Sequence, residues 1–513
     1  MENTHSRIAK NTLYLYIRMG INMLIGLYTS RLTIQILGIT SFGVYGAIIA
    51  ITTFLWFMHG SLYSTANRFI VYETGRNDVD RLRKTYGSVQ FLYVILAILI
   101  FIAEETVGLY YLHNKAVIPP ELADTSSIAF HLCVLAFMFQ ILRTPAENMV
   151  LAHERMDIFA GINITENVLK LILLLMLANI NIKNIHLLVP YSAIFVFLYF
   201  VSFTLFNIFV IREYAPQCKC SLIPQTDKTI LCEMLKFFAA DIYTAVCVTA
   251  KTNGISLLQN LFFGPAANAS ALAAGQVQAG LASLTDNFLA AIKPQLTKQY
   301  ADGNNKEVNF LIFWGIELAA LLYMLIAVPF YIEADFLIRL WLVTPPPYVS
   351  IFLKIVIITL FFEILLQPIS HTIMATGKIK RFSFYYGTMA ILSFALTALS
   401  YKLGFPVQSS YICVLVCTLI ASTAIVLLAR IQIPLFNINS FVKLTVKILF
   451  QMLLIVLPVA FIYNSMPEGW ARLISVCATG TALWIAVFFT ISFDKNMRLA
   501  IRQKIQHKIR SFF

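Results

Sequence analysis

Stretches of apolar residues long enough to cross a lipid bilayer follow one another along almost the whole of this chain. An uncharged apolar run of about 18 residues or more can cross the roughly 30 Å of hydrocarbon as a helix. Of the 513 residues, 59% are hydrophobic and 12% are charged, and the mean hydropathy is +0.78. A soluble domain has about 25% charged residues. The sequence therefore predicts an all-α integral membrane protein.

The apolar runs predict about 14 transmembrane helices. They cover residues 9–37, 41–71, 85–112, 126–150, 158–181, 187–211, 231–262, 266–297, 308–331, 349–376, 383–404, 408–430, 444–464 and 470–493. The intervals between them are too short for a soluble domain. No loop is long enough to carry a catalytic site, the eight histidines lack metal-ligand spacing, and no glycine-rich phosphate loop occurs. We expect no enzyme, no metal site and no cofactor.

Lysine and arginine gather in alternate loops. The loops rich in these residues, including 76–84, 212–228 and 430–443, fall on one side of the predicted topology. By the positive-inside rule, that side and both termini are cytoplasmic. Topology thus accounts for most of the net charge of +13, and nucleic acid is not expected as a partner.

Two halves of the chain share spaced landmarks. Pro145 precedes Pro368 by 223 residues, and Gly38 precedes Gly264 by 226 residues. Such offsets predict two six-helix lobes related by parallel duplication, followed by two C-terminal helices. The predicted segments are an N-terminal lobe at 1–211 (spans 1–6), a cytoplasmic linker at 212–230, a C-terminal lobe at 231–432 (spans 7–12), two further spans at 433–493, and a basic amphipathic cytoplasmic tail at 494–513.

Ionisable side chains occur inside many of the predicted spans. Each is costly in hydrocarbon and normally faces a helix-bundle interior or a watered cavity. These residues are Arg18, Arg143, Glu147, Glu166, Lys170, Asp241, Lys251, Asp286, Lys293 and Glu363. So many of them in one chain predict a polar route through the membrane, as in a transporter.

The helical faces divide these charges into candidate roles. Arg18 and Asn22 share one polar stripe of the first span. Buried lysine and arginine suit an anionic substrate, in particular a phosphorylated one. The candidate substrate-binding residues are Arg18, Asn22, Arg143, Lys251, Asp286 and Lys293. Carboxylates that neutralise by protonation are candidates for coupling to H⁺ or Na⁺, and these are Glu363, Asp241, Glu147 and Glu166.

A structural reading of the same charges stays open. Glu166 with Lys170, and Arg143 with Glu147, are spaced i,i+4 and can neutralise each other within one helix. Glu104 is expected in solvent near the outer end of its span.

Several short motifs carry a family resemblance that covers roughly residues 8–490. They are Asn260–Pro265, Gly275–Val277, Pro294–Tyr300, Ala152–Met156, Glu166–Leu171 and Ala375–Lys380. Together they resemble the Wzx-type polysaccharide transporters, a branch of the MOP superfamily that also holds lipid II flippases and multidrug extruders.

The resemblance implies a flippase of undecaprenyl-diphosphate-linked oligosaccharides for O-antigen, capsule or exopolysaccharide assembly. It implies alternating access in a bacterial inner membrane, with membrane lipids and polysaccharide polymerase or assembly proteins as partners. Two extra spans suit this branch, since in relatives such helices help form a groove for the lipid tail. The alternative is a MATE-like multidrug or cation antiporter.

Overall fold

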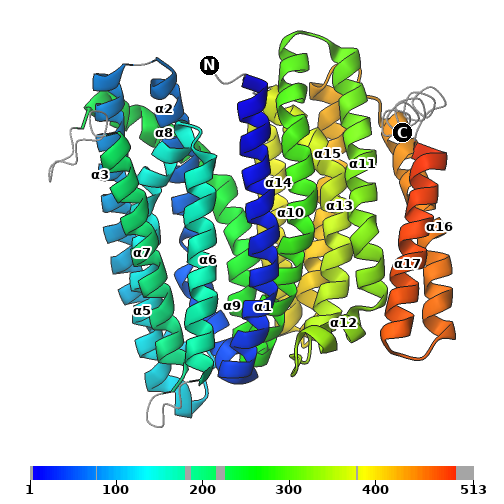
Figure 1. Cartoon of the computed structure of the whole chain (residues 1–513), viewed down its shortest axis with the longest axis horizontal. Helices are drawn as coiled ribbons and strands as arrows, with labels where there is room; N and C mark the ends of the chain where they lie inside the picture. The colour runs from blue at the N-terminus through cyan, green and yellow to red at the C-terminus, as the bar shows by residue number, and fades with distance from the viewer. Residues whose placement is uncertain (1–3, 77, 180–185, 215–225, 377–378, 493–513) are drawn as a thin grey trace, which may run out of the picture. The chain divides into compact units, whose positions relative to one another are not determined.

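The computed structural model describes residues 4–76, 78–179, 186–214, 226–376 and 379–492. In this part of the chain the regular structure is entirely helical (Figure 1). Eleven of the helices are long and apolar enough to cross a membrane. The fold is that of an all-α, multi-pass membrane protein, as the sequence predicts.

The helices divide between two compact units, of which unit 1 comprises 1–276, 341–349 and 387–414. Its helices are α1 (Thr4–Thr52), α2 (Trp56–Arg76), α3 (Val79–Ala103), the π-helix η1 (Glu104–Gly108), α4 (Leu109–Asn114), the short 3₁₀-helix η2 (Pro120–Leu122), α5 (Ala123–Ala152), α6 (Met156–Asn179), α7 (Leu188–Glu213), α8 (Lys228–Thr249), the π-helix η3 (Ala250–Gly254) and α9 (Ile255–Phe263). Within this unit α5 packs against α7, α1 against α6, and α2 against α8.

Unit 2 comprises 277–340, 350–386 and 415–513. Its helices are α11 (Asn305–Ile332), α12 (Ala334–Trp341), α13 (Val349–Ala375), α16 (Ile438–Ser465), α17 (Trp470–Val487) and the π-helix η4 (Phe488–Ser492). Three helices are divided between the units: α10 (Pro265–Ala301), α14 (Ile379–Lys402) and α15 (Ser409–Gln432). In addition, α12 and α13 each contribute one end residue, Trp341 and Val349, to unit 1.

Side-chain caps mark where several helices begin. Asp78 accepts a hydrogen bond from the backbone N–H of Arg81, and Asp227 accepts one from that of Thr229. Asn437 caps α16 in the same way. These contacts satisfy N–H groups that the first helical turn leaves without partners. The helices therefore start at polar residues, and the apolar runs follow.

The three other predicted spans are also helical but less uniform. Residues 41–71 are divided by a turn between α1 and α2, while 231–262 pass through the π-helix η3 between α8 and α9. Residues 266–297 lie within the single helix α10. All three contribute side chains to an internal cavity, and an interior helix does not need to be apolar on every face.

The paired landmarks of the two halves have matching backbone conformations. Gly38 has φ 74° and ψ 167°, and Gly264 has φ 72° and ψ −169°. Glycine adopts this region without steric cost, so each residue lets the chain bend between two helical segments. Pro145 and Pro368 both lie inside continuous helices, α5 and α13. Membrane helices tolerate such prolines. The matches favour the duplication, which stays a prediction.

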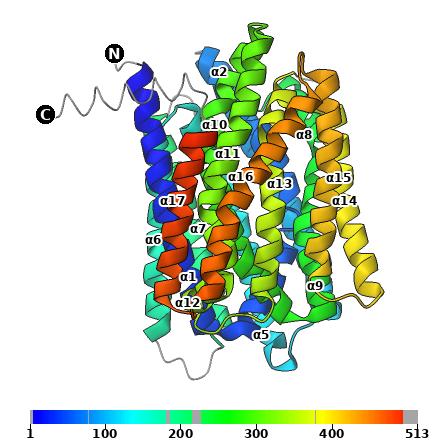
Figure 2. The same ribbon diagram turned by 90° about the vertical axis from the view of Figure 1, so that its right-hand side faces the viewer.

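In unit 2, α16 and α17 form a hairpin that lies beside α11 (Figures 1 and 2). Lys447 of α16 forms an ion pair with Glu317 of α11 at 2.7 Å. The indole N–H of Trp484 on α17 donates to the carbonyl of Leu321 at 2.7 Å. Neither Glu317 nor Lys447 is among the intramembrane charges singled out from the sequence.

Gly43 marks a close approach of α1 to α10 in unit 1. A Cβ atom there would lie 2.0 Å from the backbone carbonyl oxygen of Pro265, which cannot rotate away. We predict that Gly43→Ala lowers the apparent unfolding temperature of the detergent-purified protein, at a cost of about 1–3 kcal/mol. Gly60→Ala is the control, since a Cβ at Gly60 meets nothing within 4 Å. Equal unfolding temperatures for the two variants would contradict the close approach.

Candidate functional site

A cavity of about 580 Å³ lies inside unit 1, and we call it the unit 1 cavity. Its volume falls within the range of about 300–1,000 Å³ that is usual for ligand sites. Residues from α1, α2, α5, α6, α7, α8, η3 and α10 line it. The lining combines serine and threonine hydroxyls, the amides of Gln140, Asn253 and Gln276, and seven aromatic rings.

Most of the hydroxyls that line the unit 1 cavity donate to their own helices. Thr33 donates to the carbonyl of Thr29 at 2.7 Å, and Thr53 donates to that of Ile49 at 2.6 Å. Thr252 donates to the carbonyl of Val248. A hydroxyl has one donor and two acceptor positions, so these oxygens still offer lone pairs. The hydroxyl wall is suited to ligands that carry hydrogen-bond donors.

Lys170 is the one charged side chain among the described residues that line the cavity. Its Nζ lies 4.9 Å from the centroid of the Phe195 ring, a cation–π contact. Glu166 stands one helical turn before it on α6. Lys170 was recognised in the sequence as an intramembrane charge, but was read as a partner of Glu166 and left out of the candidate site.

Arg143, Glu147 and Glu166 form a buried ionic cluster beside the cavity. An Nη of Arg143 lies 2.7 Å from Glu166 and donates to Ser202 at 2.6 Å, and its Nε lies 3.4 Å from Glu147. The cluster joins α5, α6 and α7. None of the three ionisable groups is among the residues that line the cavity. Burying such a set requires neutralisation. Arg143 offsets one of the two carboxylates, and Lys170, one helical turn from Glu166, carries the second positive charge.

The polar stripe predicted on the first span contacts α6 in unit 1. Asn167 of α6 donates to the side-chain oxygen of Asn22 on α1 at 3.2 Å. Thr29 and Ser30, about two turns further along α1, line the unit 1 cavity. The side chains of Arg18 and Asp241 lie outside the residues whose side chains the structure describes.

The remaining predicted site residues lie in both units. Lys251 is half-buried in η3, next to Thr252, a cavity residue. In unit 2, the exposed Asp286 accepts a hydrogen bond from Gln367 at 2.8 Å. Lys293 is exposed two turns beyond Asp286 on α10, and Glu363 is half-buried one turn before Gln367 on α13. The roles predicted for these residues stay predictions.

A second cavity, of about 340 Å³, lies inside unit 2 among α11, α13 and α16, and we call it the unit 2 groove. Tyr323 and Tyr331 are the polar exceptions in an otherwise aliphatic, methionine and phenylalanine lining. The hydroxyl of Tyr323 already donates to the carbonyl of Ile357 at 2.7 Å. The groove therefore offers almost only apolar surface to a ligand.

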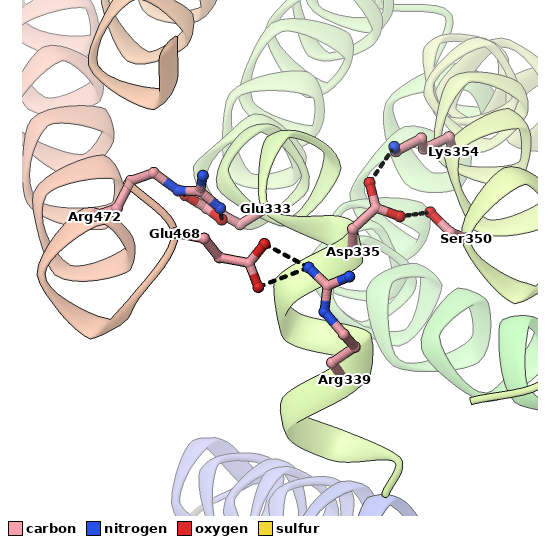
Figure 3. A network of polar contacts seen from close by, with 7 residues as sticks. All are labelled: Glu333, Asp335, Arg339, Ser350, Lys354, Glu468 and Arg472. Carbon is pink, nitrogen blue, oxygen red and sulfur yellow. Dashed lines mark hydrogen bonds and ion pairs between the residues drawn. The ribbon is translucent and has the colours of Figure 1, made fainter. Parts of the chain in front are cut away.

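A network of polar contacts holds the α16–α17 hairpin at one end of α11 (Figure 3). Arg472 makes a bidentate pair with Glu333, at 2.8 and 2.7 Å, and its guanidinium lies 4.3 Å from the Tyr463 ring centroid. Glu333 is 1% exposed. Beside this pair, Arg339 donates to both carboxylate oxygens of Glu468, in an exposed pair. Neighbouring side chains shield the first pair from solvent, and the second is open to it.

Asp335 completes the network on the α13 side. It accepts hydrogen bonds from Lys354 at 2.8 Å and from Ser350. Partial burial alone raises the pKa of Asp335, but these hydrogen bonds outweigh it and hold the pKa below its ordinary value of 3.8. The network therefore carries ionised Asp335 at neutral pH.

Glu104 corrects an expectation drawn from the sequence. It is 2% exposed, rather than solvated, and lies at the start of the π-helix η1. One of its carboxylate oxygens is buried without a hydrogen-bond partner in the structure. The position near the end of an apolar run gave no sign of this burial, because η1 packs against α1 and α5, which lie elsewhere in the chain. In the described part of the chain no three His, Cys, Asp or Glu residues are placed to hold a metal ion.

Comparison with solved structures identifies the fold. Lipid II flippase MurJ in an inward closed conformation superposes with a TM-score of 0.64 at 14% identity, over 92% of this chain and 97% of that one. An inward-facing MATE multidrug resistance transporter of the MOP superfamily superposes with a TM-score of 0.63 at 13% identity, over 83% of this chain and 96% of that one. A MOP superfamily transporter from Pyrococcus furiosus superposes with a TM-score of 0.57 at 13% identity, over 83% and 95%.

Protein-family models give no match to the chain, and neither do the sequences of curated proteins. The three-dimensional likeness therefore assigns the fold of the MOP superfamily transporters. It does not separate the Wzx-type branch from the other branches.

The two arginine–glutamate pairs of the α16–α17 network differ in burial and form an internal comparison. Arg472→Ala leaves the Glu333 carboxylate without its partner. We predict that it lowers the free energy of unfolding by about 3 kcal/mol, the lower end of the range for breaking a buried ion pair, because this pair lies near the molecular surface. Arg339→Ala is predicted to cost about 0–1 kcal/mol, as for an exposed pair. Thermal unfolding of both purified variants measures the difference. A larger loss for Arg339→Ala would contradict this assignment.

The depressed pKa of Asp335 predicts a pH dependence. Its folded-state pKa lies below the unfolded one, so its contribution to stability is complete above the unfolded pKa and is lost as pH falls through the folded pKa. We expect Asp335→Asn to unfold at a lower temperature than the wild type at neutral pH. The difference shrinks below about pH 4. A difference that does not change with pH would contradict the assignment.

Proposed function

We propose that this protein is a flippase that moves an undecaprenyl-diphosphate-linked oligosaccharide from the cytoplasmic to the periplasmic leaflet for surface polysaccharide synthesis. The observation that carries the proposal is the presence of two cavities of opposite character in one chain. The unit 1 cavity offers hydroxyls, amides and aromatic rings, and the unit 2 groove offers apolar surface. A lipid-linked sugar needs one environment for its polar head and another for its tail.

The extent of the structural likeness supports the same proposal. MurJ matches 92% of this chain, and the MATE transporter matches 83%. The difference of nine percentage points corresponds to about 46 residues of the 513, close to the 50 residues from the start of α16 to the end of α17. The α16–α17 hairpin contributes Leu449, Met452 and Val456 to the unit 2 groove. Part of the apolar wall thus comes from α16.

A MATE-like antiporter of drugs or cations is the alternative. The MATE transporter superposes on this chain with a TM-score of 0.63, nearly the 0.64 of MurJ. A site for organic cations needs carboxylates in its lining, whereas Lys170 is the charged group among the described residues of the unit 1 cavity. The positive charge favours the flippase over the antiporter.

The remaining expectations belong to this proposal. The chain lies in a bacterial inner membrane with both termini cytoplasmic, in accord with its loop charges. Transport proceeds by alternating access with H⁺ or Na⁺ as coupling ion, and polysaccharide polymerase or assembly proteins are partners. The carboxylates proposed for coupling remain Glu363, Asp241, Glu147 and Glu166, and the proposed substrate contacts remain Arg18, Asn22, Arg143, Lys251, Asp286 and Lys293.

Deletion of the gene in the native bacterium tests the function. We expect loss of the surface polysaccharide, accumulation of the lipid-linked oligosaccharide in the membrane, and restoration of both by the wild-type gene. Sensitivity to organic cations such as ethidium stays unchanged. Unaltered surface polysaccharide together with increased ethidium sensitivity would favour the antiporter and overturn the proposal.

A further inference from the structure

Resting on the proposed function, we propose that the unit 1 cavity is the glycan-binding subsite of the transporter, which holds uncharged sugar rings rather than the diphosphate. The sequence alone favoured a cationic site for phosphate. The described lining of this cavity instead has one ammonium group among many hydroxyls, amides and rings. A lining with many hydrogen-bonding groups and aromatic rings but only one charge suits a sugar.

The polar groups of the cavity can accept hydrogen bonds from sugar hydroxyls and can also donate hydrogen bonds to them. Hydroxyls such as Thr33 and Thr53 donate to backbone carbonyls and keep acceptor lone pairs, which sugar hydroxyls can use as donors. The amide of Gln140 supplies both donors and an acceptor from α5. Ser30 donates to the amide oxygen of Gln276 at 2.6 Å, and the amide nitrogen of Gln276 keeps its two donors. The wall therefore offers both donors and acceptors.

Aromatic rings supply the apolar part of the recognition. Trp56 and Phe137 both line the cavity, and their ring centroids lie 5.1 Å apart. Tyr191 and Phe195 of α7 also line it, with centroids 5.3 Å apart. Sugar rings have C–H faces that pack on aromatic surface, whereas a diphosphate has none and would lose hydration there without compensation. The cavity walls thus favour the sugar over its anionic linkage.

The positive charge of Lys170 is balanced by the ionic cluster of Arg143, Glu147 and Glu166 beside the cavity. Lys170 contacts the ring of Phe195 and stands one turn from Glu166, which is itself paired with Arg143. The two cations and two carboxylates of this group, counting Glu147, sum to zero when all are ionised. Lys170 therefore donates hydrogen bonds to sugar oxygens and repels amines, but does not form the concentrated positive field that a diphosphate needs.

Binding measurements with two lipids separate the glycan from the linkage. The probes are undecaprenyl diphosphate, which has no sugar, and the same lipid carrying the oligosaccharide of the native bacterium, isolated from a polymerase-deficient strain. The full-length protein is placed in nanodiscs. We expect Gln140→Leu to weaken binding of the oligosaccharide lipid by about 3–10-fold, as for loss of one or two hydrogen bonds, and to leave undecaprenyl diphosphate unchanged.

Gln90→Leu is the matched control. Gln90 is half-buried in α3 of the same unit, like Gln140, and does not line the cavity. It should change neither affinity. An equal loss of affinity for both lipids in Gln140→Leu would place the linkage in the cavity and overturn the inference, and so would unchanged affinities for both.

Trp56 provides an independent readout of location. It is one of five tryptophans in the chain and the one that lines the cavity. We expect the oligosaccharide lipid to change tryptophan fluorescence in the wild type, and the change to disappear in Trp56→Phe. A signal that persists in Trp56→Phe would overturn the glycan subsite. Failure of the flippase proposal looks different, because then neither lipid binds and gene deletion leaves the surface polysaccharide intact.

Discussion

The pairing of charges inside a bilayer governs this structure, since an unpartnered ionised group in hydrocarbon costs several kcal/mol. In unit 1, Arg143 lies between Glu147 and Glu166 and joins α5 to α6. In unit 2, Glu333 pairs with Arg472 and attaches the C-terminal hairpin to α11. The first of these pairs joins two consecutive helices, and the second joins helices that are distant in sequence. In both units, the contacts that neutralise the buried charges therefore also hold helices together.

Once the charges are paired, the polar groups that remain define the unit 1 cavity. Hydroxyls and amides can line a cavity in the membrane because serine and threonine return their protons to carbonyls of their own helices. The result is a polar surface without a large charge, next to a neutralised cluster. The unit 2 groove, closed on one side by α16, is its apolar counterpart. A transporter for an amphiphilic lipid would use both.

The helices were predictable because a bilayer permits few alternatives. Spans such as 126–150, 308–331 and 444–464 lie within α5, α11 and α16. Gly38 and Gly264 were recognisable as a pair, and their shared positive φ explains why glycine stands at both. Lys170 could be seen as a charge but not as a cavity residue, since its surroundings come from other helices. The α12 helix went unnoticed because eight residues carry too short a pattern.

By itself, the sequence determined the membrane class, the helical content and most of the helix bounds, because hydropathy and length are local properties that the bilayer enforces. Only the tertiary structure decided which charge meets which. It paired Arg143 with Glu166 across two helices, buried Glu104, and placed Lys170 among hydroxyls and rings. These outcomes depend on contacts between residues far apart in the chain, and helical periodicity says only which face a residue occupies, not what that face meets.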